Sequence, residues 1–204
     1  MRLIQFLKGF AMIEYITIIL ASSLFGLQHS GFSSLRVKER IIDRWGKEWY
    51  ARIFNTTSIL SLLIAFLSMN FWDWIYFITQ PALIQPILFV LGILSGLGGA
   101  VLATMAARVI SVSTVADMRT DRKAELVTDG IYSQIRHPLY LATLLVFTAL
   151  ALIYPFAVVI VFSFCMIGYT MIGAYLEERK LVKHYGDEYL EYKKTAGFIL
   201  PKLR

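Results

Sequence analysis

The sequence predicts an all-α fold: an integral membrane bundle of about five transmembrane helices with a cytosolic C-terminal helix. Hydrophobic residues make up 57% of the chain and charged residues 17%, below the ~25% charged residues of soluble domains. The apolar residues gather into five long runs separated by polar segments. The basic residues border these runs, which is typical of membrane topology and argues against a nucleic-acid partner.

The N-terminal part predicts one span followed by a surface helix. Residues 11–27 form the first apolar run, and the polar residues 28–30 are expected to end it. Residues 31–54 are basic, and their apolar side chains recur every three or four positions. This spacing predicts an amphipathic helix at the membrane surface, with a break at Gly46.

Residues 55–69 and 87–108 predict the second and third spans, joined by an aromatic segment. The third run would make a helix of about 33 Å, long enough for a ~30 Å hydrocarbon core. It contains Gly92 and Gly96 in a GxxxG pair, a spacing that lets a second helix approach closely. We expect helix packing at this pair rather than a space for a ligand.

The last two spans, residues 139–153 and 156–176, predict a tight helical hairpin. Pro138 fits the first turn of a helix, where its missing N–H removes no hydrogen bond. The fourth run reaches only about 22 Å, so Pro138 is expected to start below the membrane surface. Arg136 and His137 would then lie at a helix N-terminus in a recessed, protein-lined cavity.

The charged tail, residues 177–204, predicts a helix through Tyr192 with a bend at Gly186. All Lys and Arg residues except Arg2 and Lys8 fall on one side of a five-span topology, which the positive-inside rule makes cytosolic. The polar segments before the fourth span and after the fifth therefore emerge together on the cytosolic side.

This topology gathers Arg136, His137, Tyr140, Glu177 and Glu178 at one cytosolic site. Arginine binds a carboxylate in a fork, acidic groups hold an ammonium, and tyrosine rings shield a sulfonium. S-adenosylmethionine carries all of these groups. The alternative is that the arginine and the glutamates pair only with one another to close the hairpin.

Two segments, GIYSQIRHPLYL and EERKLVKHYGDEYLEYKK, make the chain similar to a known family. They resemble the isoprenylcysteine carboxyl methyltransferases and the wider group of small membrane methyltransferases that act on phospholipids and thiols. The resemblance covers residues 125–202 and implies bound S-adenosylmethionine. It implies cofactor contacts from Leu126, Val127, Gly130, Tyr132, Arg136, His137, Pro138, Tyr140, Glu177 and Glu178.

Within that set, Arg136 is expected to orient the donor carboxylate or an anionic acceptor, and Glu178 to balance the donor's positive charge. Ala124 departs from the family pattern, since many members carry histidine there. The segment Gln28-His29-Ser30, followed by a basic helix, resembles bacterial thiol methyltransferases. His29 is therefore a candidate substrate-side residue, or only a hydrogen-bonding residue at the interface.

The leading hypothesis is a multi-pass membrane methyltransferase whose acceptor partitions into the membrane, such as an isoprenylcysteine carboxylate or a lipid. A small-thiol S-methyltransferase is the alternative, followed by an NADPH-dependent membrane reductase and a non-enzymatic membrane protein. Residues 1–204 are predicted to form one domain, with three spans and the surface helix in 1–108 and the cofactor segment, hairpin and tail helix in 109–204. No metal site is expected, and the sequence does not distinguish carboxylate, amine and thiol acceptors.

Overall fold

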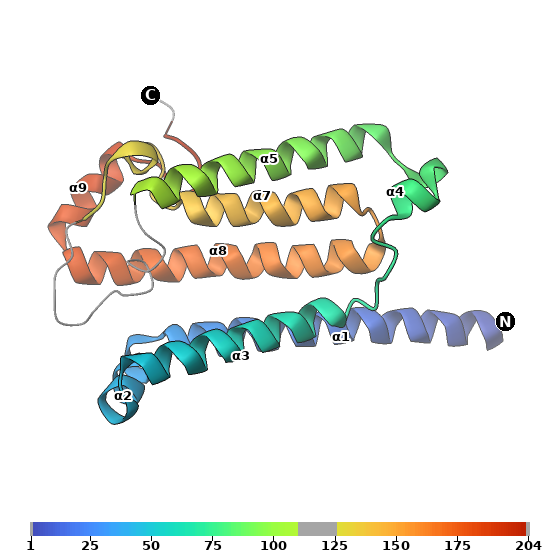
Figure 1. Cartoon of the computed structure of the whole chain (residues 1–204), viewed down its shortest axis with the longest axis horizontal. Coiled ribbons are helices and arrows are strands. Elements are labelled where there is room, and N and C mark those ends of the chain that lie inside the picture. The colour runs from blue at the N-terminus through green and yellow to red at the C-terminus, as the bar shows by residue number, and fades with distance from the viewer. Residues whose placement is uncertain (1, 110–125, 203–204) are drawn as a thin grey trace. The chain divides into compact units, whose positions relative to one another are not determined.

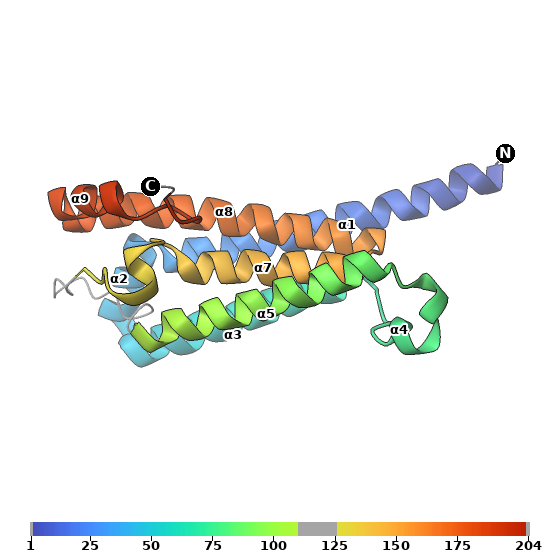
Figure 2. The ribbon, with the colours of Figure 1, turned by 90° about the horizontal axis from the view of Figure 1, so that it is seen from above.

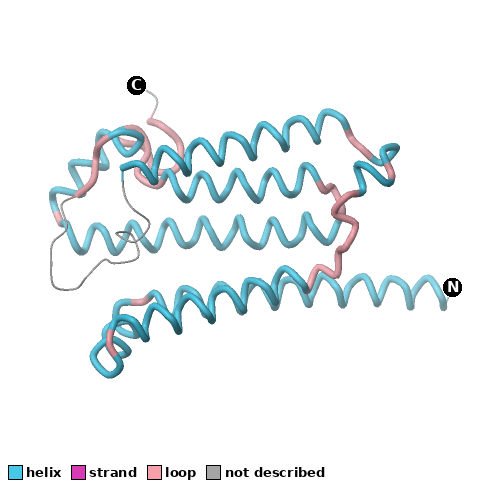
Figure 3. Tube along the Cα trace, in the orientation of Figure 1, coloured by secondary structure: helices cyan, strands magenta, loops and turns pink. Residues whose placement is uncertain are grey.

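The structure, a computed structural model, describes residues 2–109 and 126–202, and Figure 3 shows helices joined by short loops. Its helices are α1 (Arg2–Ser33), α2 (Leu35–Trp45), α3 (Lys47–Leu67), α4 (Tyr76–Thr79), α5 (Pro86–Val109), α7 (Pro138–Ile153), α8 (Ala157–Tyr185) and α9 (Asp187–Thr195). Two short 3-10 helices, η1 (Pro81–Leu83) and η2 (Gly130–Ser133), complete the elements. The predicted all-α fold is confirmed.

Within the described ranges, four helices are long and apolar enough to cross a membrane: α1 from Met12 onward, α3, α5 and α8. The fifth apolar helix, α7, has 16 residues and begins at Pro138, as predicted. Proline suits this position because the first N–H groups of a helix have no partner within it. The chain is thus a multi-pass membrane protein with the five apolar helices that the sequence predicts.

The described residues divide into two compact units. One comprises those of 1–86 and 154–169, and the other comprises those of 87–153 and 170–204. Helix α8 therefore contributes its first part to one unit and its second part to the other.

In the first unit, α1 and α3 lie side by side (Figure 1), and polar side chains join them. Gln28 donates to the hydroxyl of Thr57 at 2.7 Å and accepts from Ser61 at 3.0 Å. The predicted apolar run, residues 11–27, lies within α1, and the helix continues through the polar residues 28–30 to Ser33. These polar side chains find partners on α3, so their polarity does not require the helix to end.

Gly46 separates α2 from α3 with a φ of 85°, in the region where glycine is favoured. The predicted break is confirmed, but the predicted surface helix through residue 54 is corrected, since residues 47–54 begin α3. Tyr50 explains this boundary, because its hydroxyl donates to the carbonyl of Phe32 at 3.2 Å and its ring stacks on Phe54. These contacts hold the first turns of α3 against the end of α1.

In the second unit, α5 lies against α7, and both views place α7 between α5 and the second part of α8, from Thr170 onward (Figures 1 and 2). A Cβ on Gly92 would lie 2.7 Å from the Ile153 side chain, and one on Gly99 would lie 3.0 Å from the Ala142 carbonyl. Ser95 donates to the Leu145 carbonyl at 2.9 Å. The small residues of α5 therefore serve helix packing, as predicted.

The tail helix bends at Gly186, whose φ is 63°, and continues as α9. The predicted bend is confirmed, and the helix extends three residues beyond the predicted end at Tyr192. After the bend, Tyr189 and Tyr192 pack with Tyr185 and Ala196 in one buried cluster. Burial of these rings holds α9 against the end of α8.

Candidate active site

The segment that enters α7 is anchored by its own small core. Ile131, Tyr132 and Ile135 are buried against Ala106 of α5. Gly130 begins this segment with a φ of 58°, and a Cβ there would lie 2.9 Å from the side chain of Val109. Glycine is thus required by both backbone conformation and space. The anchored segment delivers Arg136 and His137 to the start of α7.

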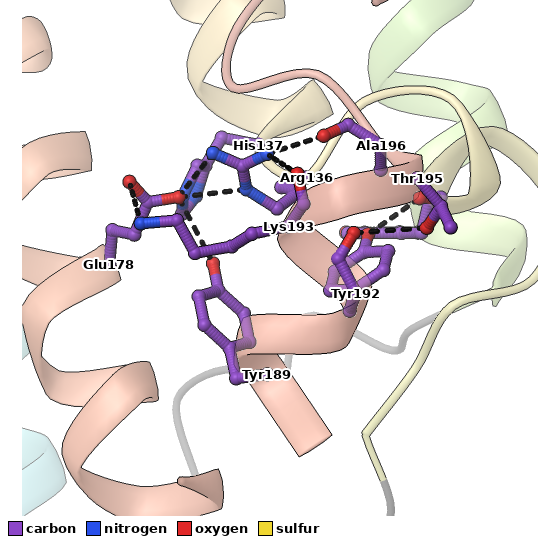
Figure 4. A network of polar contacts seen from close by, with 9 residues as sticks. Arg136, His137, Glu178, Tyr189, Tyr192, Lys193, Thr195 and Ala196 are labelled. Carbon is purple, nitrogen blue, oxygen red and sulfur yellow. Dashed lines mark hydrogen bonds and ion pairs between the residues drawn. The ribbon is translucent and has the colours of Figure 1, made fainter. Parts of the chain in front are cut away.

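Arg136 and Glu178 form the centre of a polar cluster (Figure 4). The Nε and Nη2 atoms of Arg136 lie 2.7 and 2.6 Å from one carboxylate oxygen, Oε1 of Glu178. Both side chains are mostly buried, with 7% and 13% of their surface exposed. Their burial fits the prediction of a protein-lined position for Arg136.

A short C-terminal strap, residues 196–199, runs beside the entry to α7. Its backbone accepts hydrogen bonds from the N–H of Arg136 at 2.8 Å and the N–H of His137 at 3.2 Å. A parallel bridge pairs Ile135 with Gly197. A Cβ on Gly197 would overlap the carbonyl oxygen of Leu200, so only glycine fits this turn. The strap thereby fixes the backbone that carries the two site residues.

The remaining donors of Arg136 also bind protein atoms. Its Nη1 atom donates to the carbonyl of Ala196 and contacts the carbonyl of Lys193 at 3.5 Å. The guanidinium carbon lies 5.8 Å from the centroid of the Phe198 ring. Arg136 therefore joins α7, α8, α9 and the strap at one point.

The second oxygen of Glu178 has different surroundings. Oε2 lies 3.4 Å from Nζ of Lys193, while the Tyr189 hydroxyl donates to Oε1 at 3.5 Å. Burial and the Glu178 charge raise the pKa of Tyr189, which keeps its hydroxyl protonated as a donor. A groove of about 290 Å³, here called the Glu178 groove, is lined by Tyr175, Glu178, Arg179, Val182 and Lys193. The carboxylate thus faces a space that approaches the ~300–1,000 Å³ of small-molecule sites.

His137 is buried, with 4% of its side chain exposed, between the rings of Tyr140 and Phe198. Burial lowers its pKa to about 4, against the opposing effect of the Glu178 charge. Its Nε2 atom has no hydrogen-bond partner among the described residues and lies 3.9 Å from Oε1 of Glu178. A buried polar atom without a partner is uncommon and marks a position where a ligand or water would bind.

Most other residues predicted for the cofactor site surround this cluster. Val127 and Tyr132 belong to the small core that anchors the segment carrying Arg136. Leu126 packs on the tyrosine cluster of α9. The Tyr132 carbonyl accepts a hydrogen bond from Tyr192 at 2.5 Å, and Pro138 is fully buried.

A second groove, of about 590 Å³, adjoins α9. It is lined by Leu126, Thr128, Glu188, Glu191, Tyr192, Lys194 and Thr195. Leu126 is the one residue of the predicted cofactor set that lines it.

Glu177 and His29 make other contacts. Glu177 pairs with Lys180 at 3.6 Å on its own helix, so the two adjacent glutamates differ in role. His29 belongs to the first unit, where its Nδ1 atom lies 3.1 Å from the Ser58 hydroxyl and its ring lies near Phe54 and Tyr169. Ala124, the departure from the family pattern, lies outside the described residues.

Sequence reasoning missed Lys193 and the strap. The sequence patterns identify Lys193 only as one charge of a basic tail, and they place residues 196–199 beyond the tail helix. One available signal was the apolar stretch Ala196-Gly197-Phe198-Ile199, which follows a charged helix and contains a glycine.

Comparisons with known proteins show which known sequences this chain is similar to. The sequence model described as phospholipid methyltransferase matches residues 87–188. That range includes Arg136, His137 and Glu178, and it ends before Lys193 and the strap.

Two curated relatives align with nearly the whole chain. A methanethiol S-methyltransferase of Pseudomonas deceptionensis is 31% identical over 91% of this chain and 72% of its own length. Methanethiol S-methyltransferase 1 of Bradyrhizobium diazoefficiens is 25% identical over 90% of this chain and 65% of its own length.

A third relative matches a shorter part. The protein-S-isoprenylcysteine O-methyltransferase of Saccharomyces cerevisiae is 32% identical over 45% of this chain and 38% of its own length. No solved structure matches the chain.

Proposed function

Because the chain belongs to the phospholipid methyltransferase family of membrane methyltransferases, we propose that it transfers a methyl group from S-adenosylmethionine to a small thiol. The choice of a small thiol as acceptor is based on the relatives named for methanethiol, because they align with about nine-tenths of the chain. Membership of this family favours a methyltransferase over the reductase and the non-enzymatic alternatives. The acceptor that partitions into the membrane becomes the second candidate, supported by the yeast relative over the shorter match.

The residues of the cluster fit S-adenosylmethionine by charge. The Glu178 carboxylate presents a negative group toward a groove, and the unpartnered Nε2 of His137 offers a polar contact. When bound, the donor supplies a methyl group on a positively charged sulfur. Glu178 would stabilise that positive charge in a mostly buried setting, where electrostatic attraction is less screened than in water.

Arg136 is then proposed as a positioning residue for Glu178. Its two contacts to Oε1 fix the carboxylate, and its contacts to the carbonyls of Ala196 and Lys193 fix the strap and α9. A group held by packing and hydrogen bonds loses little entropy when the reactants bind.

A thiol acceptor must lose a proton before it attacks. His137 is a weak base for that step, because its pKa of about 4 gives it little affinity for a proton near pH 7. We propose His137 as a neutral contact to the donor, and His29 as the candidate group on the acceptor side. Exclusion of water would favour the transfer, since water stabilises the separated ions more than the transition state.

The proposed active site faces the cytosol, which the distribution of basic residues supports. Reporter enzymes fused to the C-terminus test this orientation, because a periplasmic reporter would be active only if the tail crossed the membrane. Strong periplasmic activity would contradict a cytosolic site.

Methyl transfer from labelled S-adenosylmethionine tests the activity itself. The purified protein in lipid nanodiscs should convert methanethiol to a labelled volatile thioether. A base-labile methyl ester formed on an isoprenylcysteine, without thioether, would favour the second candidate. Absence of both products together with no donor binding would refute the proposal.

A further inference from the structure

A positively charged side chain lines the Glu178 groove beside the Glu178 carboxylate, and it is not the side chain of Arg136. The side chain of Arg136 is 7% exposed, and its nitrogens contact the Glu178 carboxylate and the carbonyls of Ala196 and Lys193. Releasing it to a ligand would leave Glu178 without its closest partner. A ligand that carries a carboxylate therefore needs another positive group.

Lys193 has the position and the freedom for that role. Its Nζ atom lies 3.4 Å from Oε2 of Glu178, and 35% of its side chain is exposed. Both residues line the Glu178 groove. The backbone of Lys193 is held because its carbonyl accepts a contact from Arg136 at 3.5 Å. The amine is thus placed by the cluster while its end still reaches solvent.

The pair of opposite charges is complementary to an amino-acid group, which carries one ammonium and one carboxylate. Arg136 uses only Oε1 of Glu178, so Oε2 can accept from an ammonium. We propose that Lys193 binds the carboxylate of the methyl donor's amino-acid end while Oε2 of Glu178 binds its ammonium. This inference rests on the proposed use of S-adenosylmethionine.

Arg179 is the competing cation because it also lines the Glu178 groove. Its side chain is exposed, and the cluster described above does not hold it. The Lys193 amine already lies 3.4 Å from Oε2 of Glu178, so part of its side-chain entropy is lost before a ligand binds, whereas an exposed arginine would lose that entropy on binding. Lys193 is therefore the better placed group.

Isothermal titration of the full-length protein in nanodiscs tests the assignment with three probes. S-adenosylmethionine and S-adenosylhomocysteine both carry the carboxylate, whereas decarboxylated S-adenosylmethionine keeps the sulfonium and the amine but lacks it. Lys193→Met should weaken the first two by about 10-fold or more, as expected for a lost charge-assisted hydrogen bond. The decarboxylated probe should bind the variant and the wild type within about twofold of each other.

Two further variants complete the experiment. Lys183→Met removes the same charge from an exposed position on α8 and should leave all three affinities unchanged. Arg179→Met tests the competing cation and should also have little effect.

Equal weakening of all three probes by Lys193→Met would refute a carboxylate-specific role. So would unchanged or tighter binding of S-adenosylmethionine, or a selective loss in Arg179→Met instead. Failure of the wild type to bind any probe would refute the proposed function and this inference together. The outcomes above, in which the wild type binds the probes, would refute this inference alone.

Discussion

Arg136 and Glu178, 42 residues apart in the chain, meet through a single carboxylate oxygen. Nε and Nη2 of the arginine lie 2.7 and 2.6 Å from Oε1, so Oε2 stays available to other groups. This geometry divides the carboxylate into one oxygen held by Arg136 and one that pairs with Lys193, which lines the Glu178 groove together with Glu178. Loss of either residue should therefore affect both stability and ligand binding, in different proportions.

Arg136→Ala should destabilise the protein strongly. Removing one partner of a buried ion pair costs about 3–5 kcal/mol, because the other charge stays buried without compensation. Thermal unfolding in detergent should show a clearly lower midpoint. Arg52→Ala is the matched control, since Arg52 pairs with Glu48 at an exposed site and should change the midpoint very little. Similar shifts in both variants would contradict the structural role of Arg136.

Glu178→Gln should weaken S-adenosylmethionine binding while the fold is retained. The amide keeps an oxygen that can accept from Arg136, but it removes the negative charge proposed to face the donor. We expect about a 10-fold or greater loss of affinity by calorimetry, as for other charge-assisted contacts. Glu177→Gln should bind nearly as well as the wild type, because Glu177 pairs with Lys180 on its own helix. A greater loss in Glu177→Gln would reverse the assignment of the two glutamates.

Gly197→Ala should disrupt the strap. The added methyl group would overlap the Leu200 carbonyl, so the turn and its hydrogen bonds to Arg136 and His137 must shift. We expect reduced stability and reduced donor affinity together. Gly168→Ala on α8 meets nothing within 4 Å and should be neutral or slightly stabilising, as alanine favours helices. Normal donor binding by Gly197→Ala would show that the strap is dispensable.

Protonation of His137 should destabilise the fold at acidic pH. Its pKa is about 4 in the folded state and about 6.5 in the unfolded state, so unfolding takes up a proton between these values. Stability should be unaffected by this residue above pH 6.5 and should fall by about 3 kcal/mol as the pH drops to 4. Unfolding midpoints measured across this range should depend less on pH in His137→Gln.

The exposed His184 provides the control for this pH series. His184→Gln should keep the pH dependence of the wild type. An unchanged profile in His137→Gln would mean that other groups, such as the carboxylates, cause the acid sensitivity.

His29→Ala should separate the acceptor from the donor. If His29 acts on the acceptor side, the variant should show a lower kcat or a higher KM for the thiol, with an unchanged dissociation constant for S-adenosylmethionine. Ser58→Ala removes the hydroxyl that lies 3.1 Å from the His29 ring and should have a smaller effect in the same direction. A variant that loses stability but keeps its kinetics would assign His29 to packing alone.

The fold followed closely from local patterns in the sequence. Apolar runs marked the membrane helices, Pro138 marked the start of α7, and Gly46 and Gly186 marked two breaks. The errors occurred where a polar residue found a distant partner. Residues 47–54 are predicted to lie in a surface helix, but they begin α3, where the Tyr50 hydroxyl donates to the carbonyl of Phe32. Such partners become visible only when two helices are placed together.

The candidate site was predictable in part for the same reason. Arg136, His137 and Glu178 were found because two polar motifs flank one hairpin, and topology requires them to meet. The contacts of Lys193 and Gly197 depend on the bend at Gly186 and on the return of the chain beside Ile135. Gly186 marks the bend in the sequence, but no periodic pattern marks the return of the chain beside Ile135, so spacing alone could not identify those residues.

The pairing of Ile135 with Gly197 also has a consequence for biosynthesis. Arg136 leaves the ribosome 60 residues before Ala196, the carbonyl that one of its nitrogens must bind. The apolar helices can therefore enter the membrane before this part of the site can close. A message cut short between Glu178 and Gly197 would yield a protein that inserts normally but cannot assemble its pocket. Such a product would compete for the insertion machinery and contribute no catalysis.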